Sequence, residues 1–166
     1  LLIDIKDQGE KQLPAIEQMF APYSDVFWHV DRCGKVVENP VRVVYTGGRP
    51  YDLIKDNPER FGSADGHKGD LGGEISSLDM PLISEDWASW GWQGFGERPE
   101  DQFRSLKEFS DGAHAIGARS RLWGVPELLP KRREILWQMQ LDAGIDVVGA
   151  DHLAELRAFL LERGAA

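Results

Sequence analysis

Short apolar runs alternate along the chain with stretches in which apolar residues recur every three or four positions. The compact runs predict β-strands and the wider spacing predicts amphipathic helices. The expected strands cover residues 1–6, 26–30, 41–45, 61–64, 77–83, 119–123 and 145–148, with a short extension at 35–37. The expected helices cover residues 10–21, a turn after Pro50, residues 99–116, 130–143 and a final segment that Asp151 caps.

Strands that are apolar throughout and alternate with helices predict a parallel sheet covered by helices. Two architectures fit this pattern, a doubly wound sheet and a (β/α)8 barrel. A complete barrel needs about 250 residues, or roughly 31 for each βα unit. The 166 residues therefore correspond to about six units. With no internal repeat or linker, we expect one domain over residues 1–166, a TIM-barrel-like (β/α)8 fold whose first two units are missing.

The first residue is Leu1, and it already lies in an expected strand. We therefore expect the chain to be the C-terminal portion of a longer domain, whose leader would lie upstream. The compartment stays open, and an exported bacterial protein is one of the alternatives. Cys33 is the single cysteine, which excludes an internal disulfide and a multi-cysteine zinc site.

The formal charge of −9 changes the list of expected partners. A strongly acidic chain does not bind nucleic acid or an anionic membrane nonspecifically, because both need a positive surface. No apolar stretch is long enough for a transmembrane segment. We therefore expect neither nucleic acid nor a membrane span among its interactions.

Candidate chemistry is expected at the carboxyl ends of the strands, where parallel α/β folds carry their sites. Asp4 and Lys6 alternate with apolar neighbours and would face the same side of the first strand. Arg49 follows two glycines, which let the backbone approach a ligand closely, although this segment taken alone is more typical of a plain turn before a helix. Trp123 and Glu127 follow a later strand. These side chains suit a divalent cation and a phosphate, although Asp4 and Lys6 equally suit a structural ion pair.

Three tryptophans crowd one long connection, at Trp87, Trp90 and Trp92. They would form either an aromatic lid over a ligand or a loop anchored to the core. The chain lacks a GxSxG, Walker A, HExxH or dinucleotide-binding motif. Cys33 has no matched histidine, so a thiol nucleophile is not expected.

Two segments near the end of the chain resemble the closing strands of a known superfamily. They are RLWGVPE at residues 121–127 and LDAGIDVVGADHL at residues 141–153. Both are similar to the superfamily of glycerophosphodiester phosphodiesterases and phosphatidylinositol phospholipases C, although Ala150 stands where threonine is usual. Residues 2–6 resemble its acidic-x-Lys strand, with Asp4 in place of the commoner glutamate.

One branch, which includes altered inheritance of mitochondria protein 6, is a closer match. The similar segments are VVYTGGRP at residues 43–50, MPLIS at 80–84 with the following Trp87, and residues 121–127. The resemblance covers essentially the whole chain and implies a TIM-barrel phosphodiesterase fold.

The resemblance also implies a function, a metal-dependent phosphoric diester hydrolase acting on a glycerophosphodiester or a phosphoinositide-like headgroup. Asp4 would bind Mg²⁺ or Ca²⁺, and Lys6, Arg49, Trp123 and Glu127 would bind the substrate. The catalytic histidines would lie upstream, so we expect no catalytic residue in this chain and no activity from the chain alone. The alternative is a noncatalytic binding protein on the same fold, with the tryptophan loop holding a sugar or lipid headgroup.

Overall fold

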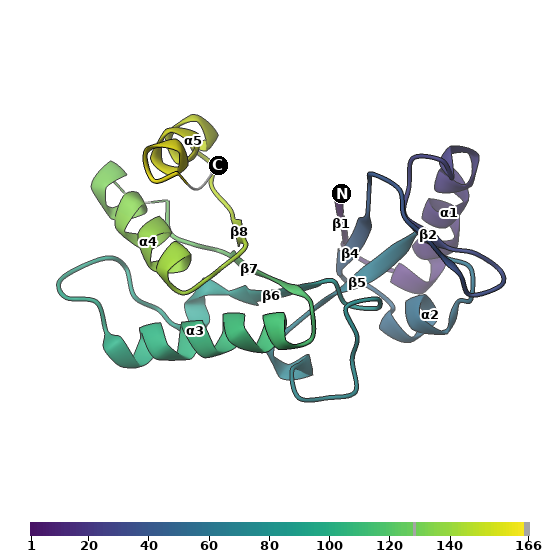
Figure 1. Cartoon of the computed structure of the whole chain (residues 1–166), viewed down its shortest axis with the longest axis horizontal. Helices are drawn as coiled ribbons and strands as arrows, with labels where there is room; N and C mark the ends of the chain where they lie inside the picture. Colours follow the sequence, from purple (N-terminus) through teal and green to yellow (C-terminus); the bar gives the residue numbers. More distant parts are fainter. Residues whose placement is uncertain (128, 165–166) are drawn as a thin grey trace. The chain divides into compact units, whose positions relative to one another are not determined.

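The computed structural model, which describes residues 1–127 and 129–164, is a mixed α/β structure (Figure 1). The chain forms two compact units. The first unit comprises Leu1–Gly66 and Gly72–Leu82, and the second comprises His67–Leu71 and the chain from Ile83 onward. The α/β class predicted from the sequence is confirmed.

The first unit contains three neighbouring parallel strands, β1 (Leu2–Ile5), β4 (Val43–Gly47) and β5 (Gly62–Gly66). Their order in the sheet is their order along the chain. All three predictions were correct to within two residues at each end. The β-branched residues of β4 place this strand in the middle, where Val43 and Tyr45 are fully buried.

Two helices connect these strands, α1 (Gly9–Phe20) and α2 (Tyr51–Asp56), and a 3-10 turn (Ala21–Tyr23) extends α1. Leu13 of α1 and Ile54 of α2 are buried in the core of the first unit. Met19 was expected on the apolar face of α1 but is 70% exposed. The apolar stripe of α1 is therefore narrower than its sequence pattern indicates.

Residues 26–30 were expected to form a strand, but only His29–Val30 (β2) does so, and it is not part of the parallel sheet. This strand pairs antiparallel with Val36–Val37 (β3), and the two form a separate sheet. The turn between them is closed by Asp31, whose Oδ1 accepts from the backbone N–H groups of Cys33 and Lys35, both at 2.9 Å. The short extension predicted at residues 35–37 is thus the partner strand of a hairpin.

The second unit contains strands β6 (Leu82–Asp86), β7 (Arg119–Trp123) and β8 (Val147–Val148), again neighbours in chain order. The strand β6 begins five residues later than predicted. Residues 76–80 form a turn instead, in which Ser76 O accepts from the N–H groups of Asp79 and Met80. Pro81 follows and has no N–H to donate to a ladder.

Three helices accompany these strands, α3 (Glu100–Ala115), α4 (Pro130–Asp142) and α5 (Leu153–Glu162). Short 3-10 turns occupy Lys68–Asp70 and Trp87–Ser89. The core of this unit is built by large apolar side chains that are at most 2% exposed, Ile83, Trp87, Leu106, Phe109, Leu122, Leu136, Trp137 and Met139. Ile135, expected to point inward with Leu136 and Met139, is 45% exposed.

The start of β8 is held to its neighbours by one carboxylate. Asp146 Oδ2 accepts from the backbone N–H of Ser120 at 2.7 Å, from Ser120 Oγ at 3.0 Å, and lies 2.8 Å from His114 Nε2. Although desolvation opposes it, the hydrogen bonds from Ser120 and His114 lower the pKa of Asp146. This carboxylate therefore ties α3, β7 and β8 together. None of the helices in residues 1–127 and 129–164 has the length and apolar character to cross a bilayer.

Candidate functional site

Asp4 and Lys6 lie at the carboxyl end of β1 and form an ion pair, with Lys6 Nζ 2.5 Å from Asp4 Oδ2. Ile5 is buried, whereas the side chains of Asp4 and Lys6 are 47% and 83% exposed. The alternation predicted from the sequence therefore places both on the side away from the buried Ile5. Because both groups stay in contact with solvent, the pair is held in place at little desolvation cost.

The end of β4 lies beside this pair. Asp4 is opposite Thr46 and Ile5 is opposite Gly47, while the N–H of Gly48 donates to Ile5 O at 2.6 Å. Gly47 has φ +71°, and a Cβ there would come within 2.3 Å of Asp4 Oδ1. Only glycine satisfies both conditions without strain. The carboxylate of Asp4 therefore packs directly against the backbone of β4.

Arg49 follows at the same strand end and is half-buried. Its Nη1 lies 3.5 Å from Gly47 O, and its buried Nε has no hydrogen-bond partner within the described part of the chain. The loop that carries it is packed tightly, because a Cβ on Gly9 would come within 2.2 Å of Gly48 O. An ammonium, a guanidinium and a carboxylate thus occupy the adjoining ends of two strands.

Asp65 is a second carboxylate on this sheet, one residue beyond the strand expected at residues 61–64. It belongs to β5, and the register of β5 on β4 pairs Val44 with Ser63 and Tyr45 with Ala64. Asp65 therefore shares a face with Ser63 and with Thr46. It is 1% exposed. The alternation from Ser63 to Asp65 is the signal that would have extended the predicted strand.

A divalent cation at this strand end would require several oxygen ligands. The carboxylate of Asp4 and the hydroxyl of Thr46 are oxygen donors of the kind that Mg²⁺ and Ca²⁺ prefer, and both ions take six or more oxygen ligands. Among residues 1–127 and 129–164, no three histidine, cysteine, aspartate or glutamate side chains are grouped as a metal site would require. Asp4 and Thr46 therefore offer oxygen donors, but the described residues do not form a complete metal site.

A hollow of about 280 Å³ lies at the carboxyl ends of β7 and β8 in the second unit. It is lined by Arg121, Leu122, Trp123, Gly124, Val125, Glu127, Gly149, Ala150 and Asp151. Trp123 is 45% exposed, as expected for a side chain that lines a pocket outside the core. Arg121 also lines the hollow, although the sequence analysis did not select it.

Glu127 is held in the wall of this hollow by two groups. Its Oε1 accepts from the backbone N–H of Asp151 at 2.8 Å, and its Oε2 lies 3.7 Å from Nε of the buried Arg133. Arg133 also pairs with Glu155 of α5. Asp151 does not cap α5 as predicted, since the helix begins after His152 and no side chain caps it. The backbone of Asp151 instead fixes Glu127.

The tryptophan-rich connection is anchored to the core. Trp87 and Trp90 are 1% and 5% exposed. Trp87 Nε1 donates to Trp92 O at 2.8 Å, and Trp90 packs against Phe109 with ring centroids 5.5 Å apart. Of the two roles considered for these tryptophans, the structure therefore favours anchoring for Trp87 and Trp90.

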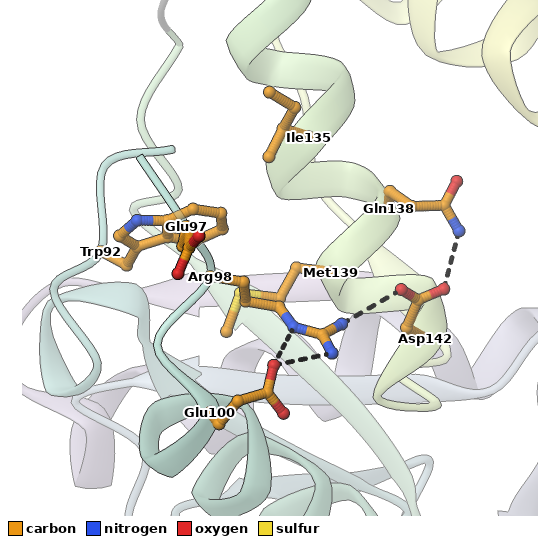
Figure 2. Close-up of a pocket in the computed structure, with 8 residues that line it drawn as sticks. All are labelled: Trp92, Glu97, Arg98, Glu100, Ile135, Gln138, Met139 and Asp142. Atoms are coloured by element: carbon orange, nitrogen blue, oxygen red, sulfur yellow. Dashed lines mark hydrogen bonds and ion pairs between the residues drawn. The ribbon is translucent and has the colours of Figure 1, made fainter. Parts of the chain in front are cut away.

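Trp92 is half-buried and borders a separate hollow of about 550 Å³ beside α4 (Figure 2). Arg98 extends into this region and pairs with Glu100 at 3.2 Å and with Asp142 at 3.4 Å. Gln138 donates to the same Asp142 carboxylate. These contacts tie the start of α3 to the end of α4, and they already engage the side chains of Arg98, Glu100, Gln138 and Asp142 with one another.

Each of the four histidines makes a structural contact. His29 Nδ1 lies 3.0 Å from Phe27 O and His67 Nδ1 lies 3.3 Å from Ser84 O. His114 contacts Asp146, and His152 Nδ1 lies 3.6 Å from Glu155. None of them lines the hollow beside Trp123.

Comparison with curated proteins finds fungal relatives named altered inheritance of mitochondria protein 6. The chain is 25% identical to the protein of Eremothecium gossypii, over 88% of this chain and 40% of that protein. It is 26% identical to the Candida glabrata protein, over 76% and 35%. A homolog from Arthroderma benhamiae is 26% identical, over 96% and 52%.

The chain thus spans about a third to a half of the length of these relatives. No family model matches the chain. No solved structure gives a significant match either. The chain is therefore similar to altered inheritance of mitochondria protein 6, a name that does not state an activity.

Proposed function

We propose that the chain is part of a metal-dependent phosphodiester hydrolase. The observation that carries this proposal is the group of charged side chains at the adjoining ends of β1 and β4. Asp4, Lys6 and Arg49 lie there beside two glycines. A carboxylate for a cation, next to an ammonium and a guanidinium for phosphate oxygens, suits an anionic phosphodiester.

Asp4 would be one ligand of Mg²⁺ or Ca²⁺, with the other ligands supplied by residues outside those described. When bound, the cation would neutralise charge on the phosphate oxygens. Lys6 and Arg49 would bind phosphate oxygens, and Trp123 and Glu127 would contribute to substrate binding. Histidines outside this chain would act as general acid and base, because its own four are engaged elsewhere.

The fold proposed for the complete domain is a (β/α)8 barrel of the phosphodiesterase superfamily. Two features support it. In each unit three strands are neighbours in chain order, and helices connect them. The charged groups stand at the carboxyl ends of strands, where barrel enzymes carry their sites. The chain would then supply six of the eight βα units.

The proposal is tested on the full-length protein with bis(4-nitrophenyl) phosphate as substrate and with Mg²⁺ or Ca²⁺ added. Asp4→Asn should weaken metal activation and lower turnover by roughly 10- to 100-fold or more, as losses around metal sites commonly do. The matched control is Asp25→Asn. Asp25 is an exposed aspartate of the same unit whose side chain makes no hydrogen bond or ion pair with the residues that the structure describes. The control variant should behave like the wild type.

Equal metal affinity and equal turnover in Asp4→Asn and the wild type would contradict the assignment of Asp4 as a metal ligand. Binding of a phosphodiester without any turnover would favour the alternative, a noncatalytic binding protein. That alternative has lost part of its support, because Trp87 and Trp90 are buried and cannot hold a headgroup. Trp123 remains exposed for either function.

A further inference from the structure

Arg121 lies on the face of β7 opposite the buried residues. Along this strand Ser120 and Leu122 are buried, whereas Arg121 is half-buried and Trp123 is exposed. The side chain of Arg121 reaches the neighbouring strand, where its Nη1 donates to Ser84 Oγ at 3.3 Å. Arg121 and Trp123 therefore line the same hollow from one strand.

The guanidinium of Arg121 has fewer protein partners than the guanidinium groups of Arg42, Arg60 and Arg133. Arg60 pairs with Asp79, and Arg133 pairs with Glu155. Arg42 donates to three oxygens, those of Ser63, Ser77 and Leu78. Within the described part of the chain, Arg121 has only the Ser84 hydroxyl and no carboxylate within ion-pair distance. Most of its five donors are left for a ligand.

The carboxylates in the wall do not neutralise this charge. Glu127 accepts a hydrogen bond from the backbone N–H of Asp151 and pairs with Arg133. These two groups already compensate the negative charge of Glu127. Asp151 is exposed and lines the hollow as well. The hollow thus combines one unpaired guanidinium with one exposed carboxylate. Such a site would bind an anion through direct hydrogen bonds from Arg121 and not through long-range electrostatic attraction.

The backbone around the hollow is closely packed at Gly124 and more open at Gly149. A Cβ on Gly124, which has φ +67°, would come within 2.9 Å of Asp86 Oδ1. A Cβ on Gly149 would meet only Leu122 O, at 3.7 Å. At about 280 Å³, the hollow is near the lower end of the range for small-molecule sites, which suits a group of phosphate size.

We propose that this hollow is an oxyanion subsite in which Arg121 binds a phosphate group of the substrate. The choice of phosphate over another oxyanion rests on the proposed function. The planar guanidinium can donate two parallel hydrogen bonds to two phosphate oxygens, which a lysine cannot do. Trp123 supplies the apolar wall beside that phosphate.

The test measures phosphate binding by the whole chain, without turnover. Inorganic phosphate is titrated into the ¹⁵N-labelled protein, and the Arg121 Nε–H and Trp123 Nε1–H resonances are followed by NMR. Both should shift together. Arg121→Met should weaken binding at least tenfold, and Arg121→Lys should restore part of it. Asp151→Asn should bind phosphate more tightly, because it removes the carboxylate that repels the anion.

Arg119→Met is the matched control, since Arg119 is an exposed arginine on the same strand that makes no side-chain hydrogen bond or ion pair with residues 1–127 and 129–164. It should bind phosphate like the wild type. Unchanged binding in Arg121→Met, or an equal loss in Arg119→Met, would overturn the subsite. If Arg121→Met does not fold, Arg121→Lys alone decides, because a phosphate affinity equal to that of the wild type contradicts bidentate binding.

The phosphate group could belong to a soluble diester or to a lipid headgroup. Glycerophosphocholine in solution and phosphatidylcholine vesicles are the two probes that distinguish these sources. Binding of either probe that depends on Arg121 supports the subsite, and binding of neither overturns it. Phosphate binding at Arg121 in a full-length protein that lacks turnover would retain the subsite and reject the hydrolase.

Discussion

Glu17 is a carboxyl group of α1 that lies in the interior of the first unit. Its Oε1 accepts from Tyr45 OH at 2.5 Å, and its Oε2 accepts from the backbone N–H of Phe61 at 2.6 Å. Desolvation by burial raises the pKa of Glu17, and the hydrogen bond from Tyr45 offsets this only in part. Burial and the adjacent carboxylate raise the pKa of the Tyr45 hydroxyl as well. The ionised form of Glu17 is therefore less favourable in the folded protein than in the unfolded chain.

This raised pKa gives stability a defined pH dependence. An acid with a raised folded pKa stabilises the fold below its unfolded pKa, and this contribution is lost as pH rises through the folded value. Glu17→Gln keeps an acceptor for Phe61 and a donor for Tyr45 but cannot ionise. We expect the free energy of unfolding of the variant to rise relative to wild type between pH 4.5 and pH 7. Urea unfolding at both pH values measures it, and a pH-independent difference contradicts the prediction.

Trp123 and Trp137 differ in burial, and their substitutions should differ accordingly. Trp137 is 2% exposed and packs edge-on against Phe159, whereas Trp123 is 45% exposed. Trp137→Ala should cost about 3–5 kcal/mol of stability, as core tryptophans do, and Trp123→Ala clearly less. Trp123→Ala should instead raise KM or lower kcat in the full-length protein. Unfolding midpoints and phosphodiesterase kinetics on both variants separate the two effects.

At the residue scale, sequence reasoning succeeded where a side chain follows a clear strand. The positions of Asp4, Lys6 and Trp123 were found because apolar neighbours mark their strands. Asp65 and Arg121 were missed, although each lies within an element. A run of small residues hid the strand around Asp65, and nothing local shows that Arg121 has no carboxylate partner among the residues that the structure describes. Ion pairs between distant segments are decided by packing, which one sequence does not display.

Among the secondary-structure elements, β1 and β4 approach each other closely at their carboxyl ends, and this close approach depends on Gly47. Its φ of +71° is unfavourable for other residues, and a Cβ would also collide with Asp4 and with Ile5 O. Gly34 has a similar φ of +75°, with nothing within 4 Å of its Cβ position. Gly34→Ala therefore reports the backbone cost alone, about 1–2 kcal/mol. Gly47→Ala should cost more than that.

The pair of variants is compared by thermal unfolding, with metal binding by the full-length protein as a second measurement. Gly47→Ala should also displace the Asp4 carboxylate and weaken the metal activation proposed for it, whereas Gly34→Ala should leave that activation unchanged. Equal stability losses in the two variants would show that Asp4 does not pack against Gly47 in solution.

Elements with strong periodicity were predicted accurately, and elements that depend on partners were not. The β7 prediction matches the structure at both ends, and α4 differs by one residue at its end. Both have clear flanking signals, a glycine after the strand and a proline at the helix start. Residues 26–30 carry a similar apolar run, yet His29–Val30 pairs with Val36–Val37. A run of β-branched residues predicts a strand but does not specify its partner.

At the scale of the whole molecule, composition and element order predicted the α/β class but not the compact units. An alternation of strands and helices is the same whether the chain forms one unit or two. The net charge of −9 is likewise a property of the whole chain. It opposes nonspecific attraction of a phosphodiester, which is itself an anion. Any phosphate binding must therefore come from local cations such as Lys6, Arg49 and Arg121.

The last prediction concerns the chain by itself. Residues 1–166 should show no metal-dependent hydrolysis of bis(4-nitrophenyl) phosphate, because a leaving alcohol needs a general acid and the described part of the chain offers none at the site. All four histidines are engaged in structural contacts, and Asp4 is one metal ligand without a recorded carboxylate neighbour that completes the site. The assay compares this chain with the full-length protein, with Mg²⁺ and with Ca²⁺. Activity of the isolated chain that disappears in Asp4→Asn would show that the site is complete within these residues and that the assignment of acid–base groups to other parts of the protein is wrong.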